Sequence, residues 1–300
     1  MSIGRTIRIG TRGSALALVQ AQWVADELEK AGADVHLMVI RTKGDNVTDL
    51  PLGSIPGKGL FVSEIEQALI EHRIDLAVHS MKDLPPDIPV GLTLAAVPKR
   101  EDPRDVIVGR TATSLSGLPK GAVIGTSSPR RSAQLMAMRS DCVVRDLRGN
   151  LDTRLRKLDE GHYDAICPAA AGLHRLGLAH RITEYIDPAV MLPAAGQGAL
   201  ALEARSDDEY TLGCVSALHH HPTANAVEAE RAVLLELGLG CSVPLGLLAV
   251  DDNGVLSLHA ALCRRDGGAV VRESISSSGS PSELGREMAL RLSLHRDLLE

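Results

Sequence analysis

The chain has 300 residues, a formal net charge of −6 at pH 7 and only 2% aromatic residues. This length is sufficient for two or three domains, each with its own hydrophobic core. The acidic charge and the lack of aromatic stacking platforms argue against a nucleic-acid-binding protein. No apolar run approaches the roughly 20 residues of a membrane span, and residues 1–9 contain no apolar signal core. We therefore expect a cytoplasmic protein that does not bind membranes.

The cysteines and histidines give no sign of a disulfide frame or a metal site. The cysteines are odd in number, widely spaced and without a CxxC pair, which is typical of reduced thiols. The three consecutive histidines at 219–221 have no Cys or carboxylate at metal-ligand spacing, so we interpret them as part of a loop. The five cysteines are Cys142, Cys167, Cys214, Cys241 and Cys263.

The first hundred residues show a β-α-β-α-β pattern, which implies a mostly parallel sheet. Ser14 can cap the first helix, and Ser63 with Glu66 has the spacing of a capping box for the second. The helices separate three apolar or alternating segments that predict strands, namely residues 7–11, 35–39 and 76–78.

The third of these strands ends in a dense polar group. The sequence His-Ser-Met-Lys-Asp at 79–83 follows the apolar run directly, and two prolines then prevent a helix from continuing. Because α/β folds bind ligands at the carboxyl ends of their strands, Lys82 and Asp83 are candidate site residues. A surface Lys–Asp pair that closes a loop explains the same pattern, and the segment alone does not decide between the two.

A second unit with the same order of elements follows. Ser127 or Ser128 can cap its first helix, which has Pro129 at the favourable first position. The triplets 9–11 and 124–126, both Ile-Gly-Thr, lie at equivalent strand-to-helix junctions and indicate two similarly built lobes. The other predicted elements are strands over 123–126, 142–147 and 164–167 and a helix over 151–159.

Two segments, 99–104 and 193–198, are predicted to connect the lobes and to form a hinge. Residues 199–202 then return the chain to the first lobe. After residue 223 the pattern changes to that of a small α+β domain, with hairpin-like connections. Its predicted elements are a helix over 226–237, strands over 243–250, 255–262 and 269–275, and a helix over 283–299. The predicted domains are 1–98 with 199–217, 104–192, and 222–300.

Arginines gather at the strand-to-helix junctions. Residues 130–157 contain seven Arg and one Lys against three Asp, a local excess of five positive charges in an acidic chain. Helix N-termini and arginine forks both bind carboxylates and phosphates, so a substrate with several such groups is implied. A solvated basic face is the alternative. The junction residues are Arg12, Ser14, Thr126, Ser128, Arg130, Arg131 and Arg148.

Two glycine-rich segments need separate treatment. Gly57-Lys58-Gly59 does not meet the Walker pattern, and no GxGxxG follows a strand, so we exclude nucleotide hydrolysis. Cys241 follows a predicted helix C-terminus, whose dipole raises a thiol pKa and so disfavours a thiolate nucleophile. A structural cysteine and a permanent covalent attachment point both fit this position.

Taken together, the motifs resemble the porphobilinogen deaminase (hydroxymethylbilane synthase) family almost from end to end. Pro129 stands where many members carry Leu, and the tail is shorter than in longer bacterial members. The matching segments are 11–18 (TRGSALAL), 57–61, 79–83, 125–128, 130–131, 147–150, 192–199 and 240–244.

The resemblance implies two periplasmic-binding-protein-like lobes with mixed, mostly parallel sheets, and a small C-terminal α+β domain with a three-stranded antiparallel sheet. It implies a transferase of tetrapyrrole (haem) biosynthesis with a dipyrromethane cofactor attached to Cys241 by a thioether. Four porphobilinogen molecules are joined on this primer, with release of ammonia, into hydroxymethylbilane. Each pyrrole carries an acetate and a propionate, which accounts for the arginines. A monomer without a metal is expected.

The resemblance also assigns roles to single residues. Asp83 matches the catalytic carboxylate, which also contacts the cofactor. A non-enzymatic solute-binding protein of the same two-lobed fold is the alternative, and the Cys241 segment in a third domain argues against it. Further cofactor-binding positions are Lys82, Thr126, Ser128, Arg130, Arg131 and Arg154. Substrate-binding positions are Arg12, Ser14, Lys58, Arg148, Arg154 and Gln197.

Overall fold

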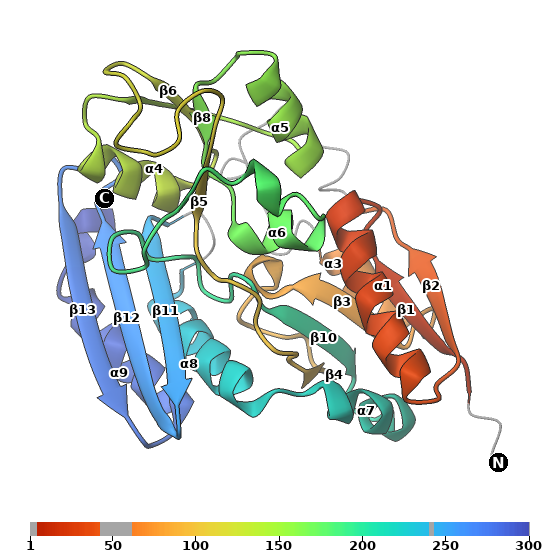
Figure 1. The fold of residues 1–300 in the computed structure, drawn as a ribbon. Helices are drawn as coiled ribbons and strands as arrows, with labels where there is room; N and C mark the ends of the chain where they lie inside the picture. Colours follow the sequence, from red (N-terminus) through yellow and green to blue (C-terminus); the bar gives the residue numbers. More distant parts are fainter. Residues whose placement is uncertain (1–4, 43–61, 240–242, 300) are drawn as a thin grey trace. The chain divides into compact units, whose positions relative to one another are not determined.

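The structure is a computed structural model that describes residues 5–42, 62–239 and 243–299 (Figure 1). Unit 1 comprises Met1–Arg100 and Ala199–Ala224, and unit 2 comprises Glu101–Gly198 and Asn225–Glu300. Unit 2 contains both the predicted second lobe and the predicted C-terminal domain, and the division into three domains stays a prediction. In the described ranges, no helix has the length and apolar character needed to cross a membrane.

The sheet of unit 1 has five strands in the order β2-β1-β3-β10-β4. β1 pairs in parallel with β2 and β3, whereas β10 runs antiparallel between β3 and β4. Only β10 opposes the direction of the others, which confirms the predicted mixed, mostly parallel sheet. The strands are β1 (Ile7–Thr11), β2 (Val35–Val39), β3 (Leu76–Ser80), β4 (Leu92–Ala96) and β10 (Leu200–Arg205).

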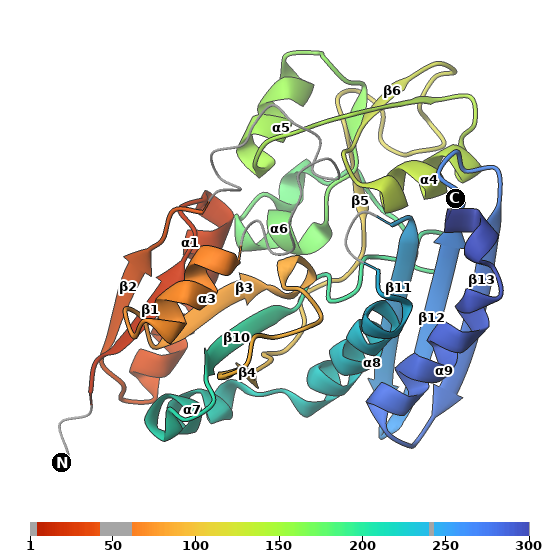
Figure 2. The same cartoon turned by 180° about the vertical axis from the view of Figure 1, so that it is seen from behind.

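Helices cover both faces of this sheet. α1 (Ala15–Lys30) and α3 (Ser63–Ile70) lie on opposite faces, as the two views show (Figures 1 and 2). Ser14 caps α1 as predicted, because its Oγ accepts a hydrogen bond from the backbone N–H of Ala17 at 3.3 Å. Unit 1 also contains η2 (Met81–Asp83), α7 (Glu209–Val215) and η4 (Ser216–Leu218).

The capping box predicted for α3 is wrong. Val62 occupies the N-cap position, and Ser63 is already the first helical residue. Glu64 and Glu66 instead lie in the first turn of α3, where negative charge interacts favourably with the N-terminal end of the helix dipole.

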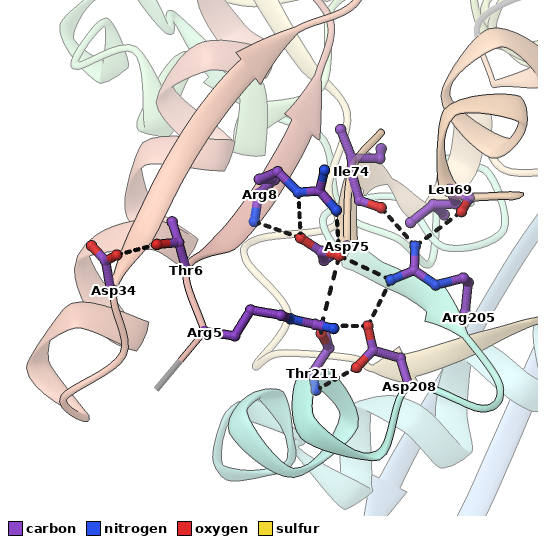
Figure 3. A network of polar contacts seen from close by, with 10 residues as sticks. All are labelled: Arg5, Thr6, Arg8, Asp34, Leu69, Ile74, Asp75, Arg205, Asp208 and Thr211. Carbon is purple, nitrogen blue, oxygen red and sulfur yellow. Dashed lines mark hydrogen bonds and ion pairs between the residues drawn. The ribbon is translucent and has the colours of Figure 1, made fainter. Parts of the chain in front are cut away.

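A network of buried ion pairs fixes the edge of the unit 1 sheet at which β1 and β3 begin (Figure 3). Asp75, which is 1% exposed, accepts hydrogen bonds from Arg8 at 2.8 and 2.9 Å and from Arg205 at 2.9 Å. Arg205 also donates to Asp208 at 2.7 Å and to two backbone carbonyl groups. Because Arg205 is the last residue of β10, the network anchors the end of this strand.

We expect Asp75→Asn to lower the free energy of unfolding at pH 7 by about 3 kcal/mol, because it leaves Arg205 buried without its full ionic partner. Burial would raise the pKa of Asp75, but hydrogen bonds from Arg8 and Arg205 outweigh it and lower the pKa to about 2. This stabilisation is present above the ordinary carboxyl pKa and is lost as the pH falls towards 2. Urea unfolding should therefore show a smaller difference between wild type and variant at pH 3.

A matched control for this prediction is Asp207→Asn, at an exposed position close to the same strand end. It is expected to change stability by less than about 0.5 kcal/mol. Equal urea midpoints for all three proteins at pH 7 would contradict the importance of the network.

The sheet of unit 2 repeats the pattern of unit 1, with the order β7-β6-β8-β5-β9. β6 pairs in parallel with β7 and β8, and β5 runs antiparallel to both β8 and β9. The central strands β1 and β6 carry the two Ile-Gly-Thr triplets or lead into them, which supports the predicted similarity of the lobes. The strands are β5 (Val106–Gly109), β6 (Val123–Gly125), β7 (Val143–Arg145), β8 (Ala165–Ile166) and β9 (Glu184–Tyr185). The helices are α4 (Pro129–Met138), α5 (Leu151–Asp159), α6 (Ala170–Arg175) and η3 (Ala179–Arg181).

The rest of unit 2 contains the predicted three-stranded antiparallel sheet, in the order β11-β12-β13. Two helices share a core with it, in which Val233, Leu258 and Met288 are fully buried. Gly285 allows the helices to approach each other, since a Cβ there would lie 2.4 Å from the carbonyl oxygen of Ala229. These elements are α8 (His221–Leu237), β11 (Leu245–Asp252), β12 (Val255–Cys263), β13 (Val270–Ser277), α9 (Pro281–Ser293) and η5 (Arg296–Leu299).

Candidate functional site

A pocket of about 60 Å³ lies in unit 1, where β1 and β3 end and α1 begins. Three predicted site residues line it together: Arg12 follows β1, Ser14 caps α1, and Asp83 ends η2. Lys82 precedes Asp83 in the same short helix and is half-buried. The other lining residues are Leu16, Ala17, Gln20, Val62, Val78, His79 and Ser80.

The end of β3 is held by contacts from both sides. Oγ of Ser80 donates a hydrogen bond to Oε1 of Gln20 at 3.1 Å, which ties the strand end to α1. The backbone N–H of Met81 donates to the carbonyl of Ala199 at 3.0 Å, just before β10. The chain then turns through η2, whose last residue, Asp83, is exposed. The fold thus presents a carboxylate on a supported turn at a strand end.

Asp105 is the centre of a buried polar cluster in unit 2. Its fully buried carboxylate accepts hydrogen bonds from Arg130 at 2.5 and 3.2 Å, Arg131 at 2.8 Å and Gln197 at 2.9 Å. Burial alone would raise the pKa of Asp105, but the charges of Arg130 and Arg131 lower it well below the usual range. Asp105 is therefore ionised at neutral pH and compensates one of the two arginine charges.

Each of the two arginines keeps one nitrogen for a further partner. Arg130 uses Nη1 and Nη2 for Asp105 and the carbonyl of Leu192, and Arg131 uses Nε and Nη2 for Asp105 and Gln197. As far as the chain is described, Nε of Arg130 and Nη1 of Arg131 have no hydrogen-bond partner. Two unused donors on a cluster with one net positive charge suit a carboxylate ligand.

Thr126 and Ser128 shape the start of α4, beside this cluster. Oγ1 of Thr126 accepts a hydrogen bond from the N–H of Ser128 at 3.2 Å. Of the two serines that the sequence offered as caps, Ser128 is the N-cap, and its Oγ accepts from the N–H of Arg131 at 3.4 Å. Ser127 instead donates to the carbonyl of Leu147 at 2.5 Å.

Arg148 and Arg154 lie at the next junction, between β7 and α5. Nε of Arg148 is 3.3 Å from Oδ2 of Asp146, and Nε of Arg154 donates to the carbonyl of Gly149 at 2.8 Å. Asn150 caps α5 through its side chain. The second arginine pair is thus less buried than the first and makes contacts that are mainly local in sequence.

Two predicted site residues, Lys58 and Cys241, lie outside the described residues. The chain before Cys241 is described up to residue 239: α8 ends at Leu237, and Gly238 adopts a left-handed φ of 65°. Leu239 N–H then donates to the carbonyl of Leu234 at 3.0 Å, which closes the helix. Cys241 therefore follows a helix C-terminus in sequence, as predicted.

Comparison with known proteins places these residues in a family. The model "Porphobilinogen deaminase, dipyromethane cofactor binding domain" matches residues 7–213, and "Porphobilinogen deaminase, C-terminal domain" matches residues 224–293. The chain belongs to the porphobilinogen deaminase family. The porphobilinogen deaminase of Syntrophobacter fumaroxidans is 50% identical over 96% of this chain and 94% of its own length. That of Thermus thermophilus is 49% identical over 99% of this chain and 96% of its own length.

Solved structures with low sequence similarity were also found. A periplasmic binding protein of Salmonella typhimurium with high arginine specificity aligns with a TM-score of 0.42 and 16% identity, over 74% of this chain and 94% of that chain. A periplasmic substrate-binding protein of a Coxiella burnetii ABC transporter aligns with a TM-score of 0.43 and 15% identity, over 75% and 96%. Membership of the porphobilinogen deaminase family rests on the sequence relatives.

The sequence analysis missed two residues that organise these sites. Asp105 follows the charged run 99–104, and only the apolar segment directly after it could have indicated that it is buried. Gln134 on α4 exchanges hydrogen bonds with the backbone of Leu192, at 2.9 and 3.0 Å, and is 2% exposed. A buried glutamine in a helix has no signal that distinguishes it from a surface one. In the described part of the chain, no group of His, Cys, Asp and Glu is arranged to hold a metal ion.

We expect Arg130→Leu and Arg131→Leu to lower the free energy of unfolding by about 3 kcal/mol each, because each leaves the buried Asp105 short of a cation. Arg148→Leu should cost less than about 1 kcal/mol, since its ion pair is with the exposed Asp146. Urea unfolding measures all three.

The matched control is Arg156→Leu, which removes an exposed arginine of the same basic segment that pairs with Glu160 on α5. It should unfold as the wild type does. Small and equal losses in all four variants would show that the basic segment is a solvated face and that Asp105 does not depend on it.

Proposed function

We propose that this protein is a hydroxymethylbilane synthase, which polymerises four porphobilinogen molecules with release of ammonia. The observation that carries this proposal is family membership over nearly the whole chain. The gathering of Arg12, Ser14 and Asp83 in one pocket supports it. The product is a linear tetrapyrrole, which places the enzyme in haem and porphyrin biosynthesis.

The chemistry of the donor set fits a dipyrromethane cofactor. Its pyrrole acetates and propionates require several cationic or N–H donors, and the Asp105 cluster offers two such donors on arginines that are 3% and 5% exposed. We propose that Arg130, Arg131, Ser128 and Thr126 hold cofactor carboxylates, together with Lys82, Asp83 and Arg154. The cofactor supplies a covalently anchored primer, which we assign to a thioether at Cys241.

We assign the incoming porphobilinogen to Arg12, Ser14, Arg148 and Arg154, with Lys58 and Gln197 as further members of the site. Arginine forks suit the geometry of carboxylates, and the capped start of α1 adds the positive end of a helix dipole beside Arg12. A substrate with two carboxylates therefore finds complementary charge at residues that belong to regular, well-packed elements.

Asp83 is proposed as the catalytic acid and base. Loss of ammonia requires a proton on the leaving amine and produces a cation on the substrate carbon. One exposed carboxyl group at the pocket can donate that proton, stabilise the cation and afterwards accept the proton that the attacked pyrrole ring releases. The proton balance of each addition is then closed at Asp83, without a second acid.

Further parts of the proposal concern the whole molecule. We propose a cytoplasmic monomer with no nucleic-acid or membrane partner. The chain passes from one unit to the other after residues 100, 198 and 224. We propose that the first two of these passages, within segments 99–104 and 193–198, form a hinge that accommodates the growing chain.

Cys241→Ser is expected to yield protein with the bare mass of its sequence, because the variant cannot form the thioether. The protein should be inactive and should melt at a lower temperature, since a ligand bound by the native state stabilises it. Intact-mass spectrometry and thermal unfolding measure both effects. Cys142→Ser, which changes a half-buried thiol in unit 2, is the control and should keep the added mass. Turnover and added mass in Cys241→Ser would refute the attachment.

Asp83→Asn is expected to bind porphobilinogen but to turn over at least about a hundredfold more slowly, the lower range for loss of a positioned acid–base group. Asp83→Glu should retain some activity, and Lys82→Gln should be milder than Asp83→Asn because lysine positions ligand without transferring the proton. Single-turnover kinetics with mass spectrometry of the bound chain make the comparison, with Asp207→Asn as the control. Addition of pyrrole units by Asp83→Asn at nearly the normal rate would show that Asp83 is not the acid.

A further inference from the structure

Three ionisable side chains come together on the α3 face of the unit 1 sheet. Leu76 and Val78 of β3 pack in the core that includes α1, whereas Ala77 packs in the core that includes α3. Because side chains alternate along a strand, His79 lies on the same face as Ala77. The same alternation along β10 puts Glu203 on this face, between residues that pack towards α1. Glu66 comes from α3 itself.

The contacts within this group are close and dry. Nε2 of His79 is 3.0 Å from Oε2 of Glu203, and the two side chains are 3% and 0% exposed. In the described part of the chain, the second carboxylate oxygen of Glu203, Oε1, is buried and has no hydrogen-bond partner. The ionisable groups that face Glu66 are Glu203 from β10, His79 from β3 and Asp87 from the segment after η2.

Charge decides how many protons this group holds. With all protons removed, Glu66 and Glu203 would carry two negative charges beside a neutral imidazole, in a mostly buried space. Burial first, and then the charge of Glu203, raise the pKa of Glu66 to about 7, against an opposing effect of His79. The group thus keeps a proton up to about neutral pH, and it gains one negative charge when that proton leaves.

His79 connects this group to the proposed active site. It belongs to the buried group, and it is also one of the residues that line the pocket with Asp83 and Arg12. Between His79 and Asp83 the chain makes only the strand end and the tight turn of η2. A charge that appears behind β3 is therefore close to the place where substrate carboxylates must bind, with little water between them to screen it.

We propose that Glu66, His79 and Glu203 form a proton-holding cluster that sets the affinity of the pocket for its anionic substrate. The inference rests on the proposed function, and it deepens it. With the proton in place, the cluster carries one net negative charge, and substrate carboxylates bind beside Arg12. Without it, the second negative charge repels them. Glu66 and Glu203 are positioning residues that act through His79, and Asp83 remains the group that exchanges protons with the substrate.

The first test follows KM and kcat for porphobilinogen from pH 6 to pH 8 with the cofactor-loaded enzyme. The substrate carboxylates are ionised throughout this range, so a change in KM reports the protein. We expect KM of the wild type to rise about fivefold, as one added charge at short range would cause. Glu66→Gln, which keeps the neutral form at every pH, should show a flat KM and an unchanged kcat profile. Identical KM profiles in wild type and Glu66→Gln would overturn the inference.

The control is Glu71→Gln, which removes an exposed carboxylate at the end of the same helix. It should reproduce the wild-type rise in KM. A flat KM in this control would show that surface charge in general, and not the cluster, affects the pocket.

The second test needs no turnover. The ring signals of His79 are followed by NMR over the same pH range and assigned by their absence in His79→Asn. In the wild type they should change around the pH at which KM rises, and Glu66→Gln should remove that change. If the His79 signals change identically in both proteins, the cluster shares no proton and the inference is wrong. A wild type that adds no pyrrole units would refute the proposed function instead, while the NMR result would still decide whether the cluster exists.

Discussion

The insertion of β10 between β3 and β4 is the constraint on which unit 1 depends. β3 would otherwise be an edge strand, and the polar turn that follows it would lack support. Pairing with β10 joins Leu200 to Ser80 in register, and the carbonyl of Ala199 accepts from Met81 at the start of η2. At the other end of β10, Arg205 is fixed by Asp75 and Asp208 (Figure 3). The place of Asp83 therefore depends on residues more than a hundred positions later in the chain.

Unit 2 solves the corresponding problem with a buried acid. Its antiparallel strand, β5, follows Asp105 directly, so the strand that completes the sheet also brings a carboxylate to the start of α4. Two arginines on one helical turn would repel each other and lose hydration on burial. Asp105 offsets one charge and orients both forks, which leaves one defined donor nitrogen on each. Such buried ion pairs contribute more to specificity than to stability, and a site that must recognise paired carboxylates benefits from that specificity.

The features that could be predicted from the sequence are those decided by neighbouring residues. The caps Ser14 and Ser128 and the hairpin at Asn253-Gly254, where both residues have positive φ, need only local geometry. Short elements such as β4 and β9 were missed, because two to five residues carry little periodicity and their strand partners are distant. α8 begins before the predicted residue 226, and α9 ends before the predicted residue 299. The predicted arginine cluster was sound in composition, but Asp105 as its internal partner requires the fold.

The charge of the whole chain says little about its site, and the two units show why. The protein has a net charge of −6, yet its proposed ligands are polyanions. Attraction at short range is enough, because exposed charges more than about 8–10 Å away are screened at physiological ionic strength. Unit 2 places an acid directly against its arginines, where it orients them without cancelling their combined charge. Unit 1 places acids behind the sheet, where burial keeps a proton on them and so limits the negative charge near the pocket. Acidic residues thus serve an anion site in two ways, by aligning its cations and by remaining protonated.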